Sequence, residues 1–326
     1  MPAERVLSQR ELNRAMLARQ LLLERSPGSI ESVLEQMGGL QNQYAPSGYV
    51  GLWSRMADFP RDSLTRALED RRVIQATLIR STIHLVSAAD YWLFAAGARR
   101  GRQEWWLRIQ RHDAPAAVVE QAAAAVRSRL EVGPQRQADL IRTVEELGHS
   151  RMVWNAVGLW LDMVRVPPSG TWERRRADLY SLADAWLGPC TAGEREGIEH
   201  LVLRYLGGFG PAPVRDIANW AGIPVAAVRP TAERLDLRRF RDKEGRELVD
   251  LPEARLPDAD IPAPVRFLPT WDAALLIHCR RTQVLPERFR PLVFNTKTPH
   301  SKPVFLVDGA VAGTWRYDKG RVELTP

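Results

Sequence analysis

Residues 214–251 read VRDIANWAGIPVAAVRPTAERLDLRRFRDKEGRELVDL, and this stretch decides the expected fold. Apolar residues at helical spacing predict a helix over 214–221, a turn at 222–224 and a second helix over about 225–235. Two β-rich runs, around a turn at 243–245, complete the stretch. Helix, short glycine turn, helix and hairpin in this order are typical of a helix-turn-helix with a wing.

Two earlier parts of the chain follow the same plan. The first opens with a capping box at Ser8-Gln9-Arg10-Glu11 that starts one helix, and a second helix is expected to begin near Ser29 and to stop at Gly38-Gly39. An irregular segment through Pro46 and Gly48 is expected next. A helix over 61–69 and β-rich runs over 73–79 and 82–86 complete this first part. In the second part, helices are expected over 138–147 and 151–163, with β-rich runs over 164–166 and 178–180.

Residues 252–264 carry four prolines among acidic residues, a composition typical of a linker. Beyond them, short β-rich runs at 292–294, 304–307, 311–317 and 321–324 predict a terminal β-meander. We therefore expect a mainly α protein with β wings (α+β), in which tandem winged-helix motifs form a C-shaped DNA-binding architecture with a C-terminal β-rich segment. The expected domains are a first winged-helix unit over 1–112, a second over 113–190, a third over 191–256 and the β-rich domain over 257–326.

The charge of the chain favours a nucleic-acid partner. The 326 residues carry a formal charge of +7, and the sequence pI is about 9.8. Arginine supplies nearly all of the positive charge, and its planar fork suits phosphates and guanine edges. Two distant cysteines indicate neither a disulfide scaffold nor a zinc site. With no apolar run of about 18 residues, we expect a cytoplasmic protein without membrane, metal or cofactor.

Four sequence motifs indicate a more specific protein class. They are Gln41-Asn42-Gln43, then Arg80-Ser81-Thr82-Ile83-His84-Leu85-Val86, the run from Phe267 to Asp272, and the run from Val307 to Trp315. In this order they resemble the AlkZ-type DNA glycosylases, a winged-helix superfamily that also contains the YcaQ type. The resemblance extends from about residue 8 to about residue 318.

The resemblance implies a catalytic role for Gln41 and Gln43. An N7-alkylated purine is already cationic and leaves readily, so the enzyme must chiefly position a water and stabilise an oxocarbenium. A glutamine can hold such a water without ionising. AlkZ-type members carry Gln-x-Gln and YcaQ-type members Gln-x-Asp, usually with an apolar middle residue, whereas Asn42 is polar. The structural alternative is that both glutamines only cap the preceding helix.

Basic and polar residues on the expected helices and wings are candidates for DNA contact. Arg80 lies at the tip of the first hairpin, while His84, in an alternating strand, is as readily a structural residue. Asp272 shares a motif with the family, but an N-cap of a helix over 273–279 is the favoured reading. The candidate DNA-binding residues are Arg80, Thr82, His84, Arg174, Arg175, Arg229, Arg234, Arg238, Arg239, Lys297, His300 and Lys302.

These observations lead to one preferred function. No lysine occurs in the first 242 residues, and strand-cutting glycosylases need an amine nucleophile, so we expect a monofunctional enzyme. The resemblance implies excision of bulky N7-alkylguanine adducts, with crosslink unhooking, for DNA repair or genotoxin self-resistance. Two rivals stay open: a non-catalytic winged-helix DNA binder and a YcaQ-like enzyme for simple alkyl lesions. Without a heptad region that could form a dimer interface, a monomer is expected.

Overall fold

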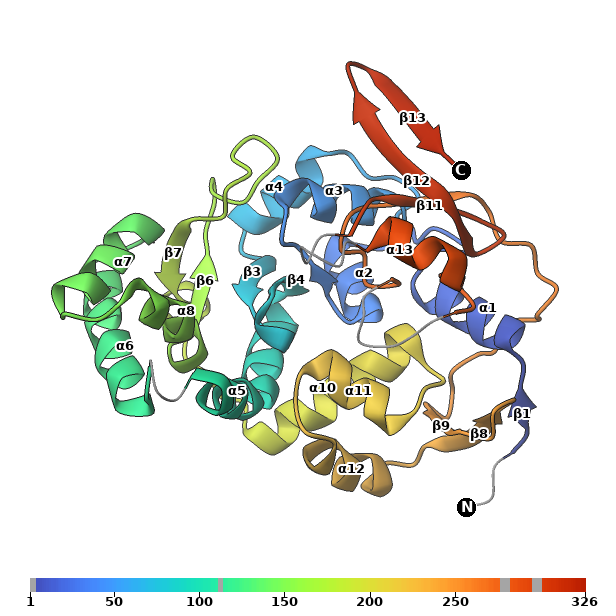
Figure 1. The fold of residues 1–326 in the computed structure, drawn as a ribbon, viewed down its shortest axis with the longest axis horizontal. Helices are drawn as coiled ribbons and strands as arrows, with labels where there is room; N and C mark the ends of the chain where they lie inside the picture. Colours follow the sequence, from blue (N-terminus) through green and yellow to red (C-terminus); the bar gives the residue numbers. More distant parts are fainter. Residues whose placement is uncertain (1–3, 111–113, 276–281, 295–300) are drawn as a thin grey trace.

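The structure, a computed structural model, describes residues 4–110, 114–275, 282–294 and 301–326. Helices and short strands alternate along the first part of the chain (Figure 1). The elements up to residue 110 are β1 (Val6–Leu7), α1 (Gln9–Arg19), α2 (Ile30–Met37), β2 (Leu40–Gln41), α3 (Ala45–Trp53), α4 (Asp62–Glu69), β3 (Val73–Thr77), the 3-10 turn η1 (Ile79–Ser81), β4 (Ile83–Ser87) and α5 (Ala88–Gln110).

The rest of the chain adds two helical regions, each followed by a hairpin, and a final β-rich segment. Counting the elements up to residue 110 as the first helical region, the second region contains α6 (Ala116–Glu131), β5 (Gln135–Arg136), α7 (Gln137–Glu146), α8 (Arg151–Trp160), β6 (Met163–Arg165), β7 (Leu179–Leu182) and α9 (Ala183–Leu187). The third region contains α10 (Glu194–Phe209), α11 (Val214–Ala221), α12 (Val225–Arg234), β8 (Arg238–Asp242) and β9 (Glu247–Asp250). The β-rich segment contains β10 (Arg266–Leu268), η2 (Glu287–Phe289), α13 (Arg290–Val293), β11 (Val304–Val307), β12 (Ala310–Asp318) and β13 (Arg321–Thr325).

The central sheet joins strands from the first half of the chain. Its order is β2-β4-β3-β6-β7-β5, with every neighbouring pair antiparallel. The pairing of β3 with β6 fuses the hairpins of the first two helical regions edge to edge. In this register Gln41 lies opposite His84, and His84 lies opposite Ala76. These three side chains therefore share one face of the sheet.

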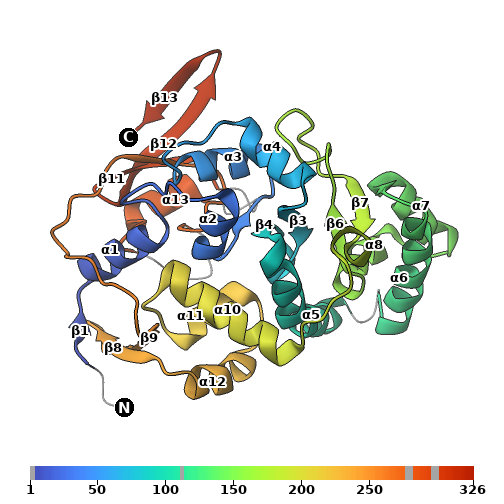
Figure 2. The same ribbon diagram turned by 180° about the vertical axis from the view of Figure 1, so that it is seen from behind.

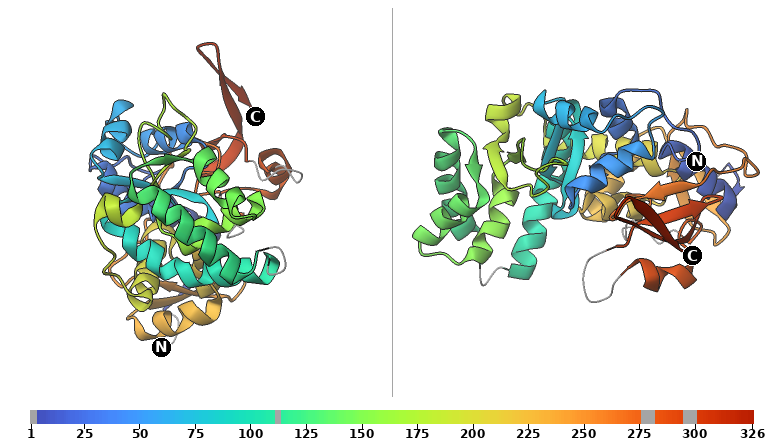
Figure 3. Two further views of the ribbon diagram at one scale, coloured as in Figure 1. Left: turned by 90° about the vertical axis from the view of Figure 1, so that its left-hand side faces the viewer. Right: turned by 90° about the horizontal axis from the view of Figure 1, so that it is seen from above.

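The third region has its own sheet. Strand β1 pairs in parallel with β8, which pairs with β9, so the N-terminal strand completes the hairpin that follows α12. The C-terminal strands β10 to β13 form an antiparallel meander. The β12–β13 hairpin stands out from the body of the protein (Figure 3, left).

Helices α5 and α10 lie side by side at the centre of the fold (Figure 2). Their backbones meet at two glycines: a Cβ on Gly97 would lie 2.5 Å from the carbonyl carbon of Gly197, and one on Gly197 would lie 2.4 Å from the nitrogen of Gly97. The main core packs around this crossing. Its aromatic centre is Trp220, whose ring centroid lies 5.4 Å from that of Tyr205 and 5.8 Å from that of Phe94.

The overall outline is concave on one side. Seen from above, the end of α5 and the region of α13 project toward the same side of the molecule, with the central sheet between them (Figure 3, right). This arrangement positions the strands β2, β3 and β4 at the middle of the molecule (Figure 1).

Several predicted elements are present with nearly the predicted ends, and other predictions are wrong. The capping box at Ser8, the end of α2 at Gly38 and both helices α11 and α12 are confirmed. The irregular segment expected around Pro46 is instead helix α3, because proline is tolerated in the first turn of a helix. The strand expected over 292–294 is replaced by α13, and Phe294 keeps only an isolated bridge to Ser301.

Candidate active site

The loop with the two glutamines begins where α2 ends. Gly38 and Gly39 both have positive φ, at 74° and 76°, which turns the chain from the helix into β2. Gly39 also lets β2 approach β4 closely, since a Cβ there would lie 3.0 Å from Cγ1 of Val86. The two glycines thus place Gln41 beside His84 at the edge of the central sheet.

Gln41 is buried and held by one cation. Its side-chain Oε1 accepts a hydrogen bond of 3.2 Å from Nη2 of Arg80, and the residue is 6% exposed. Arg80 also donates from Nη1 to the carbonyl oxygen of Trp220 in α11. The backbone of Arg80 has a φ of 51°, in the left-handed region, so the hairpin tip is bent to direct the guanidinium inward. The carboxamide of Gln41 is therefore oriented, with Oε1 toward Arg80.

Gln43 is exposed at the end of the same loop. Its Oε1 accepts a 2.6 Å hydrogen bond from the backbone N–H of Ile83. Neither glutamine caps α2, whose last turn is closed by backbone hydrogen bonds of Gly38. Because a carboxamide oxygen has two lone pairs and the amide two donors, each glutamine keeps hydrogen-bonding capacity beyond these contacts.

Asn42, between the two glutamines, closes the loop. Its backbone N–H donates to the carbonyl of Ile83 at 2.7 Å, and its side-chain Oδ1 accepts from the N–H of Gly48 at 2.9 Å. The second contact satisfies a donor in the first turn of α3. Asn42 thus ties the glutamine loop to α3, while its side-chain nitrogen is buried without a hydrogen-bond partner among the described residues.

His84 is a structural residue in this arrangement. It is 2% exposed, and its Nδ1 lies 3.0 Å from the carbonyl oxygen of Thr82, so Nδ1 carries the proton and Nε2 is the acceptor. Burial lowers the pKa of His84 to about 3, with a further contribution from the charge of Arg80. The imidazole is therefore neutral at physiological pH. Thr82, also a candidate for DNA contact, donates its hydroxyl proton to the carbonyl of Ile79.

The other candidate DNA-binding residues separate into two groups. Arg174, Arg175, Arg229 and Lys302 are exposed. Three arginines of the third region are engaged in ion pairs: Arg234 with Glu199 at 2.5 Å, Arg238 with Glu4 at 2.8 Å, and Arg239 with Glu247. Lys297 and His300 lie outside the described residues.

Asp272 forms an ion pair that the sequence did not indicate. Both of its oxygens accept from Arg55, at 2.8 and 2.9 Å, and both side chains are fully buried. The residues that follow as far as Leu275 form turns, and the rest of the helix expected over 273–279 lies outside the described residues. The pair fastens the C-terminal segment to the chain just after α3.

Sequence reasoning missed an aromatic pocket next to Gln43. It encloses about 490 Å³ and draws on four separate segments of the chain. Its lining comprises Tyr44, Pro46, Ser47, Val50, Trp172, Arg175, Pro269, Thr270, Pro303, Trp315 and Tyr317. Four of these residues, Tyr44, Pro269, Thr270 and Trp315, lie in or directly beside motifs already noted, but nothing local in the sequence indicates that they meet.

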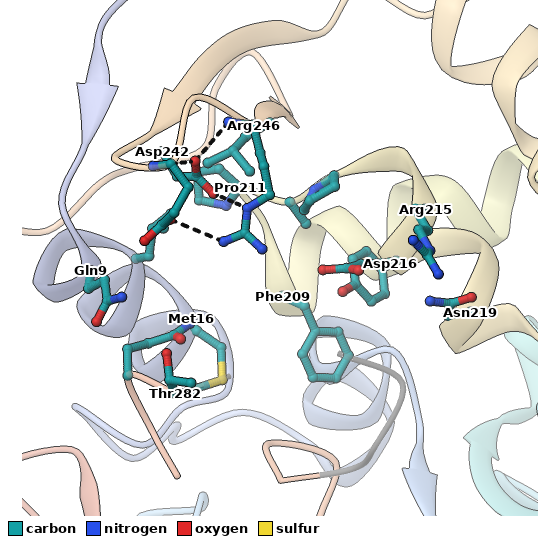
Figure 4. Close-up of a pocket in the computed structure, with 17 residues that line it drawn as sticks. Gln9, Met16, Phe209, Pro211, Arg215, Asp216, Asn219, Asp242, Arg246 and Thr282 are labelled. Atoms are coloured by element: carbon teal, nitrogen blue, oxygen red, sulfur yellow. Dashed lines mark hydrogen bonds and ion pairs between the residues drawn. The ribbon is translucent and has the colours of Figure 1, made fainter. Parts of the chain in front are cut away.

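A second, more polar pocket of about 390 Å³ lies in the third region (Figure 4). Helix α1, the end of α10, α11 and the β8–β9 turn surround it, and Asp242 pairs with Arg246 at its rim at 2.5 Å. It shares no lining residue with the glutamine loop. The pocket therefore does not extend the glutamine site.

Among the described residues there is no group of three or more histidine, cysteine, aspartate or glutamate side chains arranged to hold a metal ion. None of the helices in the described part of the chain combines the length and the apolarity that a membrane span requires.

Comparison with known proteins agrees with the glutamine motif. The sequence profile described as "DNA glycosylase AlkZ-like" matches residues 34–326. Among solved structures, the DNA glycosylase AlkZ of Streptomyces sahachiroi superposes with a TM-score of 0.83 at 20% identity, covering 98% of this chain and 91% of that one. Comparison with curated protein sequences gives no match. The overall mixed α and β fold is therefore one that a solved structure shares.

Proposed function

We propose, because this chain belongs to the AlkZ-like family of DNA glycosylases, that it hydrolyses the N-glycosidic bond of N7-alkylguanine in double-stranded DNA. The proposal includes bulky adducts and those that join two strands. It further takes the enzyme to be monofunctional and monomeric, with a role in DNA repair or in self-resistance to a genotoxin. The observation that supports it best is that one loop carries both an exposed glutamine, Gln43, and a buried glutamine, Gln41, whose orientation is fixed by Arg80.

The proposed reaction needs few groups. Alkylation at N7 makes the purine cationic, so the bond from C1′ to N9 breaks with its electron pair moving to the base, which leaves neutral. A water attacks C1′ and, as the new C–O bond forms, releases a proton to the surrounding solvent. Gln43 would accept a hydrogen bond from this water through the second lone pair of Oε1, and the Nε2 of Gln41 would donate to it. Neither side chain changes its protonation state.

The surroundings of the glutamines suit a cationic transition state. His84, the nearest titratable neighbour on the sheet, stays neutral because burial lowers its pKa. The carboxamide dipoles are held by backbone and side-chain contacts before substrate arrives, so they need little reorganisation during the reaction. Among the described residues, Arg80 is the cation bonded to Gln41, and its other terminal nitrogen donates to the carbonyl of Trp220.

The lysines support a monofunctional reaction. A β-elimination mechanism needs an amine that attacks C1′ and forms a Schiff base. In the part of the chain that the structure describes, no lysine lies in the glutamine loop: Lys243 and Lys319 lie in turns of the β8–β9 and β12–β13 hairpins, and Lys302 is exposed just before β11. We therefore expect an intact strand with an abasic site as the product.

The test measures base release from a defined lesion. The purified protein is incubated with a duplex that contains N7-methylguanine, and the free base is quantified by mass spectrometry alongside alkali-labile abasic sites. We expect release by the wild type and a loss of about 100-fold or more in the Gln43→Ala variant, the scale seen when one transition-state hydrogen-bonding group is removed. Gln36→Ala, an exposed glutamine on α2, serves as the matched control.

The same experiment separates the proposed glycosylase from the non-catalytic DNA binder that the sequence left open. A non-catalytic binder would shift the methylated duplex in a gel but release no base. Release that is abolished equally by Gln43→Ala and Gln36→Ala would point to misfolding rather than to the glutamine loop, and circular dichroism of both variants settles which applies.

A further inference from the structure

Four arginines line a small cavity, here called the arginine cavity, at the loop that joins β6 to β7. This loop reaches from the second region toward the helices α3 and α4 (Figure 1). The cavity encloses about 250 Å³ and is lined by Arg136, Pro168, Ser169, Arg174, Arg175, Arg176, Asp178 and Leu179. The lining thus contains four guanidinium groups and one carboxylate. A hollow surface with such an excess of positive charge attracts an anion.

Strand pairing brings Arg136 to this loop from a distant part of the sequence. Strand β5 pairs with β7, and Arg136 lies opposite Leu179. Nη1 of Arg136 and Nε of Arg176 each lie 3.2 Å from a carboxylate oxygen of Asp178. Arg174 is exposed and forms no ion pair with any described residue. One carboxylate therefore gathers two guanidinium groups beside a third that has no counter-charge.

The loop is organised before any ligand binds. The hydroxyl of Ser169, a residue that is 5% exposed, donates to the carbonyl of Arg176 at 2.8 Å and accepts from the N–H of Asp178 at 2.6 Å. The hydroxyl of Thr171 accepts from the N–H of Arg174 at 3.3 Å. Because these bonds fix the backbone that carries the arginines, a ligand need not order the loop when it binds.

Arg175 connects the arginine cavity with the glutamine loop. Its Nη1 donates to the hydroxyl of Tyr44 at 2.9 Å, and its guanidinium lies over the rings of Tyr44 and Trp172. Tyr44 directly follows Gln43. The N–H of Trp172 in turn donates to the hydroxyl of Tyr49 in α3 at 3.1 Å. The cavity is thus held at a fixed place relative to the residue proposed to hold the attacking water.

We propose that the arginine cavity binds one backbone phosphate of the DNA at a fixed number of nucleotides from the lesion. The inference rests on the proposed function and identifies the part of the substrate that this loop recognises. Guanidinium N–H groups bind phosphate oxygens in a fork, and Arg136, Arg174 and Arg176 supply them. Phosphates recur about every 3.4 Å along each strand, so holding one of them determines which C1′ lies beside Gln43.

The test neutralises one phosphate at a time. Duplexes of one sequence carry N7-methylguanine on a 2′-fluoro sugar, which blocks loss of the base by destabilising the oxocarbenium. Each duplex also carries a single uncharged methylphosphonate, placed in turn at every position near the lesion on either strand. Affinity is measured by fluorescence anisotropy at one salt concentration. For the wild type we expect one position at which neutralisation weakens binding roughly tenfold, the scale of a lost charge-assisted hydrogen bond, with smaller losses elsewhere.

A double variant and a matched control locate the site. The side chains of Arg136 and Arg176 are 56% and 78% exposed, so changing both to glutamine, Arg136→Gln with Arg176→Gln, leaves the core intact. At the sensitive position, this variant should lose less than about threefold on neutralisation, because the two partners of that phosphate are already gone. Arg129→Gln removes an exposed arginine of α6 outside the cavity and should keep the full loss there.

Three outcomes would overturn the inference. They are equal losses at every position in the wild type, an undiminished loss at the sensitive position in the double variant, and a loss that Arg129→Gln removes as completely as the double variant does. Because the 2′-fluoro duplexes report binding alone, a position-specific loss in a protein that releases no base would refute the proposed reaction and leave the phosphate site standing. Release of N7-methylguanine without any position-specific loss would do the reverse.

Discussion

Arg80 donates a 3.2 Å hydrogen bond to Gln41 while its other terminal nitrogen holds the carbonyl of Trp220 in α11. One guanidinium therefore connects the glutamine loop with the third helical region. The turn between α11 and α12 is packed directly on it, since a Cβ on Gly222 would lie 2.9 Å from the nitrogen of Arg80. The orientation of Gln41 is thus set by a contact between parts of the chain about 140 residues apart.

Replacing Arg80 should impair the reaction more than the fold. Arg80→Ala removes the donor that orients Gln41, and we expect base release from N7-methylguanine DNA to fall about tenfold to 100-fold with a loss of stability of about 1–3 kcal/mol. Single-turnover rates and urea unfolding measure the two effects. Arg80→Lys, which cannot reach both acceptors with a planar fork, should recover stability better than rate. Unchanged single-turnover rates in both variants would contradict this role.

His84 should make the protein lose stability on mild acidification. Its folded-state pKa of about 3 lies below the ordinary value of 6.5, so between these values the unfolded chain binds a proton that the folded chain does not. Stability therefore falls as the pH drops below 6.5, by about 2 kcal/mol between pH 7 and pH 5 from this group alone. The measurement is urea unfolding at both pH values.

Other groups titrate over the same interval, so the comparison must be with a variant. In His84→Gln the non-titrating amide removes the contribution of position 84 while a polar group remains. We expect the difference in stability between wild type and variant to change by about 2 kcal/mol from pH 7 to pH 5. A constant difference would show that the imidazole is already solvated and titrates normally.

Breaking the pair between Arg55 and Asp272 should be costly. Both side chains are fully buried, so Asp272→Asn leaves an uncompensated guanidinium and should destabilise the protein by about 3–5 kcal/mol. The double change Arg55→Met with Asp272→Leu removes both charges and should recover most of that loss. Thermal unfolding of the three proteins checks the order. A double variant as unstable as Asp272→Asn would indicate that geometry, rather than charge burial, dominates.

Local patterns predicted the elements that have a single apolar face. Helix α11 has the predicted ends, because Gly222 stops it in the left-handed conformation. Helices α5 and α10 carried no comparable signal. Their backbones meet at Gly97 and Gly197 in the centre of the fold, and α5 also borders the core around Trp106, so apolar residues point in several directions.

The candidate site, too, could be predicted from local sequence only in part. The position of the glutamine loop follows from neighbouring residues, since Gly38 and Gly39 end α2 and start β2. Its chemistry depends on Arg80, whose two acceptors are distant in sequence. The aromatic pocket is built from segments around 44–50, 172–175, 269–270 and 303–317, and its single rings have no periodic pattern that a sequence window could detect.

Salt dependence of DNA binding should separate free arginines from paired ones. In the part of the chain that the structure describes, Arg174 and Arg229 are exposed and form no ion pair, whereas Arg238 is paired with Glu4 at 2.8 Å. With about six phosphate contacts the log–log slope of affinity against salt should be roughly −5. Arg174→Ala and Arg229→Ala should each lower its magnitude by about 0.9.

Arg238→Ala is the matched control for this measurement. Its charge is already compensated by Glu4, so its removal should change the slope by less than the loss of either free arginine. The slopes are obtained by anisotropy titrations of an undamaged duplex between about 50 and 200 mM salt. If Arg238→Ala flattened the slope as much as Arg229→Ala, the ion pair with Glu4 would have to open when DNA binds, and the third region would contact the duplex through its hairpin as well as through α12.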